Sequence, residues 1–225
     1  MKAMILAAGF GERMRPLTDH LPKPLLLCAG KPLIVYHIEA LVAVGVKDIV
    51  INHAYLGAKI EAALGDGAAY GAHIQYSAEG VPLDTGAGIA KALPLLGDEP
   101  FILVYGDVWT VFDYKQLFDR NIDLAHLVMV DNPAHHPQGD FALLNSGRVS
   151  ADRNSRDGVG LTYSGIGILH PKLFAFCPQG PFPLREPLLA AMGDNRVSGQ
   201  HYQGKWTDVG TPQRLQHLEQ QILGG

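Results

Sequence analysis

The sequence of 225 residues lacks most features that mark secreted, membrane or nucleic-acid-binding proteins. Its two cysteines, Cys28 and Cys177, are too few for a disulfide framework and lack metal-site spacing. No stretch approaches the roughly 20 apolar residues that span a bilayer, and the apolar start soon meets charged residues. A formal net charge of −4 also excludes a general polyanion binder. We therefore expect a soluble cytoplasmic protein that binds neither nucleic acid nor membrane.

What the sequence does contain is a regular alternation of apolar runs. Hydrophobic residues make up 47% of the chain, enough for a large core. Short, β-branched runs alternate with segments of helical period, which is typical of βαβ units. The pattern predicts strands near residues 3–7, 48–52, 74–77, 101–105, 124–130, 141–144 and 161–169, and helices from Pro32 to Gly45 and over 212–223. We expect one α/β domain, Rossmann-like (GT-A-like) and doubly wound, with a mostly parallel sheet flanked by helices.

A glycine-rich segment follows the first predicted strand. Gly9 and Gly11 would let backbone N–H groups approach an anion, and Arg13 and Lys23 add positive charge nearby. Lys23 lies between two prolines, which stiffen the backbone and so can aim its side chain. The segment lacks the third glycine of the dinucleotide fingerprint and is not a Walker A motif. It predicts a triphosphate-binding loop; a glycine turn with solvated arginines is the alternative.

Two aspartates occupy positions typical of a metal site. Asp107 follows a predicted buried strand, at the end where α/β folds bind ligands. Asp208 precedes a glycine turn and the last predicted helix. Mg²⁺ prefers one or two carboxylates together with phosphate oxygens and water, so the pair is sufficient. The alternative is that both residues cap a turn or a helix.

In this order, the segments resemble the signature of the sugar-1-phosphate nucleotidyltransferases, Leu-x-x-Gly-x-Gly-x-Arg followed by Pro-Lys-Pro. The resemblance runs almost end to end. It implies Mg²⁺-dependent transfer of a nucleotidyl group from an NTP to a sugar 1-phosphate, with release of pyrophosphate. The implied catalytic residues are Arg13 on the NTP phosphates, Lys23 on the reacting phosphates and Asp107. The implied metal ligands are Asp107 and Asp208.

The resemblance also assigns one substrate to each half of the chain. Residues 1–112 would bind the nucleotide, with Ala7, Ala8, Gly9, Gly11, Arg13, Glu79, Thr85 and Gly86 as contacts. Residues 113–225 would bind the sugar and close the site, with Gly139, Asp140, Tyr163, Ser164 and Gly165 as contacts. Thr85 could instead cap the helix that follows it. The oligomeric state is not indicated by the sequence.

Within the family, residues 106–110 and 130–133 and the short chain are most similar to members that act in bacterial cell-wall recycling. This implies UTP and N-acetylmuramate 1-phosphate as substrates. A cation should then contact the lactyl carboxylate of the sugar, and the candidates are Arg153, Arg156, Arg185 and Lys205.

Two alternatives stay open. The first is uridylyl, guanylyl or thymidylyl transfer to another hexose 1-phosphate. The second is a nucleotide-sugar-binding regulator without catalysis, supported only by Tyr105, which stands where related sequences carry asparagine; Val111 also departs, standing where they carry an acidic residue.

Overall fold

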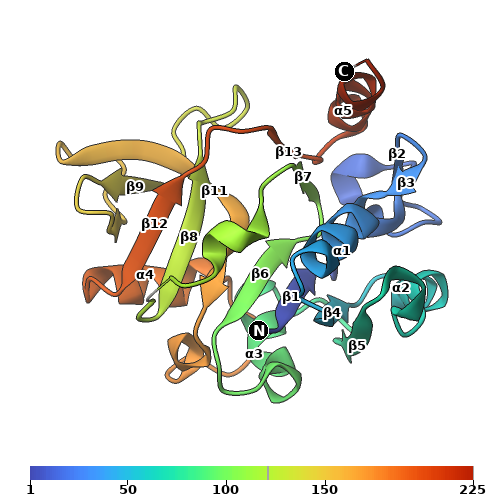
Figure 1. Ribbon diagram of the computed structural model, residues 1–225, viewed down its shortest axis with the longest axis horizontal. Coiled ribbons are helices and arrows are strands. Elements are labelled where there is room, and N and C mark those ends of the chain that lie inside the picture. The colour runs from blue at the N-terminus through green and yellow to red at the C-terminus, as the bar shows by residue number, and fades with distance from the viewer. Residues whose placement is uncertain (121, 225) are drawn as a thin grey trace.

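A nine-stranded sheet is the centre of the computed structural model, which describes residues 1–120 and 122–224 (Figure 1). Its main path runs β10-β9-β11-β6-β1-β4-β5. The first half of the chain supplies four parallel strands, β1 (Ala3–Leu6), β4 (Asp48–His53), β5 (His73–Ala78) and β6 (Phe101–Tyr105). Their carboxyl ends therefore meet at one edge, where α/β sheets bind ligands.

The second half of the chain extends the sheet. The long strand β11 (Gly158–Leu169) runs antiparallel to β6 and also pairs with β8 (Ala125–Val130) and β9 (Phe141–Leu144). The outer strands are β10 (Val149–Ser150) on β9 and β12 (Val197–His201), which is parallel to β8. The register of β11 against β8 shifts between Tyr163 and Ile166. Such a bulge bends the strand and re-aims its side chains.

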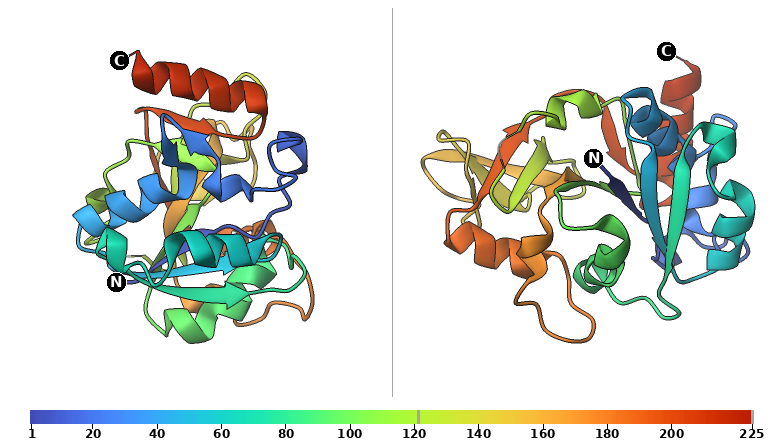
Figure 2. Two further views of the ribbon diagram at one scale, coloured as in Figure 1. Left: turned by 90° about the vertical axis from the view of Figure 1, so that its right-hand side faces the viewer. Right: turned by 60° about the horizontal axis from the view of Figure 1, so that its bottom comes forward.

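Helices cover both faces of the sheet (Figure 2). Alternate residues of β1 point to opposite faces, so Met4 joins the core cluster beneath α3 (Thr85–Leu96) and α4 (Arg185–Gly193), while Ile5 joins the cluster beneath α1 (Leu33–Ala43) and α2 (Gly57–Leu64). The short 3-10 helices are η1 (Glu12–Met14), η2 (Lys23–Leu25), η3 (Ala68–Tyr70), η4 (Tyr114–Leu117) and η5 (Pro171–Phe174).

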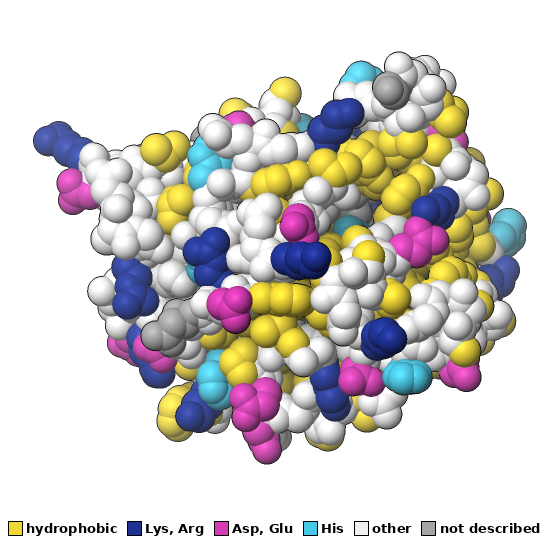
Figure 3. Space-filling view, viewed as in Figure 1, with side chains coloured by type: hydrophobic (Ala, Val, Ile, Leu, Met, Phe, Trp, Pro, Cys, Tyr) yellow, Lys and Arg dark blue, Asp and Glu magenta, His cyan; other side chains and the backbone are white. Residues whose placement is uncertain are grey.

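A third, smaller layer lies under the last helix, α5 (Pro212–Leu223). There β7 (Val108–Thr110) pairs with β13 (Trp206–Asp208), and β2 (Leu27–Cys28) pairs with β3 (Lys31–Pro32). The apolar cluster between them contains Met14, Leu26, Cys28, Leu33, Trp109, Val209, Leu215 and Leu218. Apolar side chains also form a band beneath α5 on the face shown in Figure 3.

The fold confirms the predicted class, a mixed α/β architecture with a mostly parallel central sheet flanked by helices. The predicted strands agree with the observed ones to within three residues at each end, and the helix over 212–223 has the predicted bounds. His37, the polar residue on the predicted core face of α1, is buried. The short strands β2, β3, β7, β10, β12 and β13 were not predicted. None of the helices in the described ranges is both long and apolar enough to cross a membrane.

Candidate active site

Two adjoining clefts open at the carboxyl ends of the parallel strands. The larger cleft, of about 600 Å³, is lined by the loop after β1 and by Lys23, Asn52, Asp84 and Thr85. The smaller cleft, of about 330 Å³, is lined by residues of the second half, including Asp140 and Asp208. Arg13, Tyr105 and Asp107 line both clefts. Two molecules bound side by side would therefore meet at these three residues.

Most of the predicted contacts line the cleft in which they were expected. The larger cleft includes Ala7, Ala8, Gly9, Gly11, Arg13, Lys23 and Thr85. The smaller cleft includes Asp107, Asp140, Tyr163, Ser164, Gly165 and Asp208. Glu79, Gly86 and Gly139 are not among the lining residues.

The loop after β1 is held by hydrogen bonds at Gly11 and is open to the cleft at Gly9. Gly11 has a φ of +67°, and its carbonyl accepts the Thr18 hydroxyl at 2.8 Å and the Met14 amide at 2.8 Å. The left-handed conformation favours glycine because it has no Cβ. At Gly9, in contrast, an added Cβ would meet no described atom within 4 Å. The backbone at Gly9 therefore faces free space in which an anion could lie.

Glu79 was predicted to contact the nucleotide, but it lies behind the residues that line the larger cleft. One of its oxygens accepts the Asn52 side-chain amide at 2.6 Å, and the other accepts the Leu83 amide at 2.9 Å. Asn52 in turn accepts the Ala7 amide at 2.9 Å and lines the cleft. Both Glu79 oxygens are therefore used by the protein. The missed residue is Asn52, whose signal was a polar side chain at the carboxyl end of a parallel strand.

The start of α3 does not support the alternative that Thr85 caps this helix. Asp84 is the N-cap, since its carboxylate accepts the Thr85 amide at 2.6 Å, and Thr85 lines the larger cleft. Thr85 instead accepts the Leu184 amide at 2.8 Å through its hydroxyl oxygen. Gly86 packs against Phe182, whose ring carbons would lie 2.5 Å from a Cβ. Gly86 thus serves helix packing and not the cleft wall.

Asp107 is ion-paired with Lys23 across the floor of the site. The Lys23 ammonium donates to the carboxylate at 2.6 Å, and the two side chains are 11% and 39% exposed. The preceding Gly106 lies against β1, because an added Cβ would lie 2.7 Å from the Leu6 carbonyl oxygen. This close approach of β1 and β6 brings the loop after β1 and the turn at Asp107 together.

Asp208 is brought to Asp107 by the pairing of β7 with β13. Asp208 stands opposite Val108, and the Val209 amide donates to the Asp107 carbonyl at 2.8 Å. The Asp208 carboxylate accepts from Arg214, and His135 Nε2 lies 3.0 Å from its other oxygen. Asp107, directly before β7, and Asp208, at the end of β13, therefore lie side by side and line the smaller cleft.

The carboxylate pair fits a metal that shares its coordination with a ligand. Within the part of the chain that the structure describes, no cluster of three or more His, Cys, Asp and Glu side chains could hold a metal ion. Asp107 and Asp208 offer hard oxygen donors, and each is paired with a cationic side chain. Mg²⁺ is suited to such a site, because it takes one or two carboxylates and completes its shell with phosphate oxygens and water.

The smaller cleft is built around Asp140 and the bulge of β11. Asp140 accepts His136 Nε2 at 3.2 Å and the Tyr163 amide at 2.9 Å. The Ser164 hydroxyl donates inward to the Val128 carbonyl at 2.7 Å, so its backbone and not its hydroxyl is free to line the cleft. Gly139 faces the Leu161 carbonyl, 2.6 Å from an added Cβ, and lies outside the lining.

Tyr105 forms the wall between the clefts. Its ring meets that of Tyr163 edge-on at 5.8 Å, and Gly165, at a φ of +79°, leaves room for it. Burial and the Asp107 carboxylate raise the pKa of the Tyr105 phenol, so it stays neutral. Val111, the second departure from related sequences, is 58% exposed and outside both linings.

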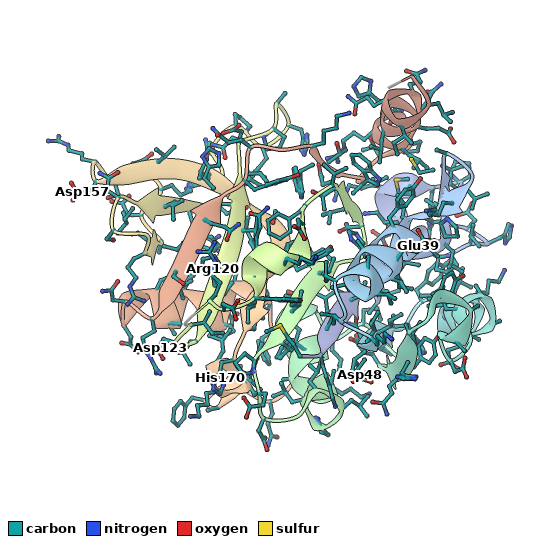
Figure 4. All side chains as sticks on the ribbon, viewed as in Figure 1. Glu39, Asp48, Arg120, Asp123, Asp157 and His170 are labelled. Atoms are coloured by element: carbon teal, nitrogen blue, oxygen red, sulfur yellow. The ribbon has the colours of Figure 1, made fainter. Side chains whose placement is uncertain are left out.

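The four cations expected near the sugar do not line either cleft. Arg185 lies over the Phe141 ring at 4.9 Å. Arg153 donates to the Gly139 carbonyl at 3.3 Å and so supports the loop that carries Asp140. Arg156 precedes Asp157, which projects from the outer end of the molecule (Figure 4). The cationic or imidazole groups that do line the smaller cleft are Arg13, His135 and His136.

Comparison with known proteins agrees with this geometry. A family profile described as nucleotidyl transferase matches residues 2–154. The chain belongs to the nucleotidyl transferase family. This nucleotidyl transferase is 53% identical to the N-acetylmuramate alpha-1-phosphate uridylyltransferase of Neisseria meningitidis serogroup B, over 100% of the chain and 99% of that protein. It is 36% identical to the enzyme of the same name from Caulobacter vibrioides, over 94% and 92% of the two chains.

The fold of this nucleotidyl transferase is also found among solved structures. A putative glucose-1-phosphate thymidylyltransferase from Bacillus anthracis superimposes with a TM-score of 0.82 at 20% identity, over 97% of this chain and 94% of that one. At this identity the likeness extends to the fold alone.

Proposed function

We propose that this nucleotidyl transferase moves the uridylyl group of UTP to N-acetylmuramate α-1-phosphate and releases pyrophosphate. The observation that carries the proposal is the pair of clefts that meet at Arg13, Tyr105 and Asp107. Such a site can hold two substrates with their phosphates in contact. The choice of UTP and of the muramyl sugar rests on the full-length similarity to the Neisseria protein.

The larger cleft is proposed to hold UTP. The backbone at Gly9, which faces open space, and at Gly11, which lines the cleft, would contact the β- and γ-phosphates, and Arg13 would receive the departing pyrophosphate. Ala7, Ala8 and Thr85 would surround the base. Glu79 would act through Asn52, which it holds in place against the Ala7 amide.

The smaller cleft is proposed to hold the sugar phosphate. Asp140 and the backbone at Tyr163 to Gly165 would bind sugar hydroxyls. We also propose that the protein works in the cytoplasm, in the recycling of cell-wall sugars.

Catalysis is proposed to depend on positioning and charge. The sugar phosphate oxygen attacks the α-phosphorus, the bond to the oxygen that bridges to the β-phosphate breaks, and that oxygen leaves with pyrophosphate. The nucleophile is largely dianionic near pH 7, since its second pKa is about 6, so no general base is needed. Lys23 would balance charge on the reacting phosphates. Asp107 and Asp208 would hold Mg²⁺, which would neutralise phosphate charge when bound.

A substrate panel tests the proposal. The purified protein is offered UTP, GTP, dTTP, ATP and CTP, each with the 1-phosphates of N-acetylmuramate, N-acetylglucosamine, glucose and mannose, and pyrophosphate release is measured. We expect the highest catalytic efficiency with UTP and the muramyl sugar. Equal efficiency on N-acetylglucosamine 1-phosphate would favour an ordinary hexose substrate. No pyrophosphate from any pair, from protein that binds UTP, would favour a non-catalytic regulator.

A further inference from the structure

Arg214 is a cation at the site that the proposed chemistry does not yet use. It lies in the first turn of α5, where its amide is capped by the Thr211 hydroxyl oxygen at 3.3 Å. Its guanidinium donates to one oxygen of Asp208 and lies 2.7 Å from His135 Nε2. Its side chain is 21% exposed, so the charge is largely sheltered from solvent.

Arg214 itself lines neither cleft, but its guanidinium contacts one lining residue of each. Asp208, its ion-pair partner, lines the smaller cleft. Gly210, which lines the larger cleft, lies directly against the Arg214 guanidinium, so that a Cβ at Gly210 would collide with it. Arg214 thus contacts a residue in the wall of each cleft. Asp208, which it holds, lines the smaller cleft together with Arg13, Tyr105 and Asp107, where the two substrates are proposed to meet.

The pairing of Arg214 with Asp208 has the same form as the pairing of Lys23 with Asp107. In each case a carboxylate proposed to hold a metal is ion-paired with a basic side chain, and Asp208 has His135 as a second neighbour. Both basic groups compete with a metal for carboxylate oxygens. Two phosphate-bearing substrates bring more negative charge than Lys23 and Arg13 carry, so a further cation at the junction would favour their approach. The backbone cap fixes the base of the Arg214 side chain while its long stem leaves the guanidinium free to turn.

We propose that Arg214 is a second phosphate-binding residue, held on Asp208 in the ligand-free protein and transferred to the reacting phosphates when Asp208 takes a metal. The inference rests on the proposed function. It extends that function by giving the first turn of α5 a direct part in the reaction.

Two variants separate this role from simple support of Asp208. In Arg214→Gln, Mn²⁺ should bind the nucleotide-free protein about two- to fivefold more tightly, because a competing ion pair of modest strength is gone. UTP should bind the Mn²⁺-loaded variant about tenfold more weakly, because a hydrogen bond to a charged group is lost. Turnover should fall about 100-fold, and Arg214→Lys should recover part of it.

The control is Arg196→Gln, which removes an exposed arginine paired at 2.6 and 2.8 Å with Asp123, labelled in Figure 4; neither residue lines a cleft. It should change neither binding constant nor turnover. Weaker Mn²⁺ binding in Arg214→Gln, or unchanged UTP binding and turnover, would overturn the proposal, since a mere support of Asp208 would weaken the metal site. Failure of the proposed function would show itself differently, as wild-type protein that turns over no substrate pair, and the Mn²⁺ comparison would still decide whether Arg214 competes for Asp208.

Discussion

At the scale of single residues, the site is a set of charges paired within the protein. Lys23 is the clearest case, because its ammonium is 11% exposed and is bonded to Asp107. We predict that Lys23→Ala lowers turnover by about 100-fold or more, as expected when a cation that stabilises the transition state is lost. The unfolding temperature should change little, because the turn of η2 is held by backbone bonds such as Leu26 N to Lys23 O at 3.1 Å.

Pyrophosphate release and thermal unfolding, measured on the same preparations, check this prediction. Lys31→Ala is the matched control, since Lys31 forms an exposed ion pair with Glu39 away from the clefts. A Lys23→Ala variant that unfolds early and regains normal turnover at low temperature would mean that Lys23 has a structural role.

Residues with local signals were predicted well, and residues with distant partners were not. The placement of Arg13, Lys23 and Asp107 follows from glycines and prolines beside them in the sequence. Glu79 was assigned to the nucleotide because its segment resembles the family's base-binding loop, and its bond to Asn52, 27 positions away, has no local signal in the sequence. Arg214 was missed because its position in an amphipathic helix is typical of a solvated residue.

At the scale of elements, a buried histidine joins the site to the helix behind it. His37 of α1 is bonded through Nε2 to the Val108 carbonyl of β7 at 2.7 Å and through Nδ1 to the Tyr114 hydroxyl at 2.9 Å. Burial lowers the pKa of His37 from 6.5 to about 4. As the pH falls, the unfolded chain therefore binds a proton at His37 at a higher pH than the folded protein does.

We predict that this histidine makes the fold sensitive to acid. Its contribution is fully present above pH 6.5 and is lost as the pH falls towards 4, with a total on the order of 3 kcal/mol. His37→Gln can keep both hydrogen bonds and cannot titrate. Free energies of unfolding between pH 4 and 7 should therefore fall less steeply for the variant than for the wild type. Parallel curves for the two proteins would show that His37 does not titrate in this range.

The strands that His37 supports were also the hardest elements to predict. β7 and β13 have three residues each, too short for an alternation of apolar and polar side chains to be visible. Their pairing joins Thr110 to Trp206, and no local pattern encodes such a distant contact. The longer strands β1, β4, β5 and β6 were predicted, because buried parallel strands are near-continuous apolar runs.

At the scale of the whole molecule, the last helix packs against residues 14–33, which follow the first strand (Figure 1). Leu218 of α5 is fully buried in a cluster with Met14 and Trp109. Met14 belongs to the loop after β1, and Trp109 belongs to β7. Glu219 of the same helix accepts the Ala29 amide at 2.9 Å. Because α5 also carries Arg214, which donates to Asp208, the packing of α5 positions Asp208 as well as the loop after β1.

We predict that Leu218→Ala lowers the free energy of unfolding by about 2 to 5 kcal/mol, the usual loss when a buried leucine leaves a cavity. Below its unfolding temperature the variant should also show a raised KM for UTP. The cavity left by Leu218 lies in the cluster that contains Met14, so the loop after β1 should become less well ordered. Leu223→Ala is the control: this leucine is on the same helix but 73% exposed, and its loss should change stability by less than about 0.5 kcal/mol. Chemical denaturation gives the first quantity and steady-state kinetics the second. If Leu218→Ala were destabilised yet had an unchanged KM for UTP, α5 would stabilise the fold without positioning the loop after β1. The last helix would then affect the site only through the overall free energy of unfolding.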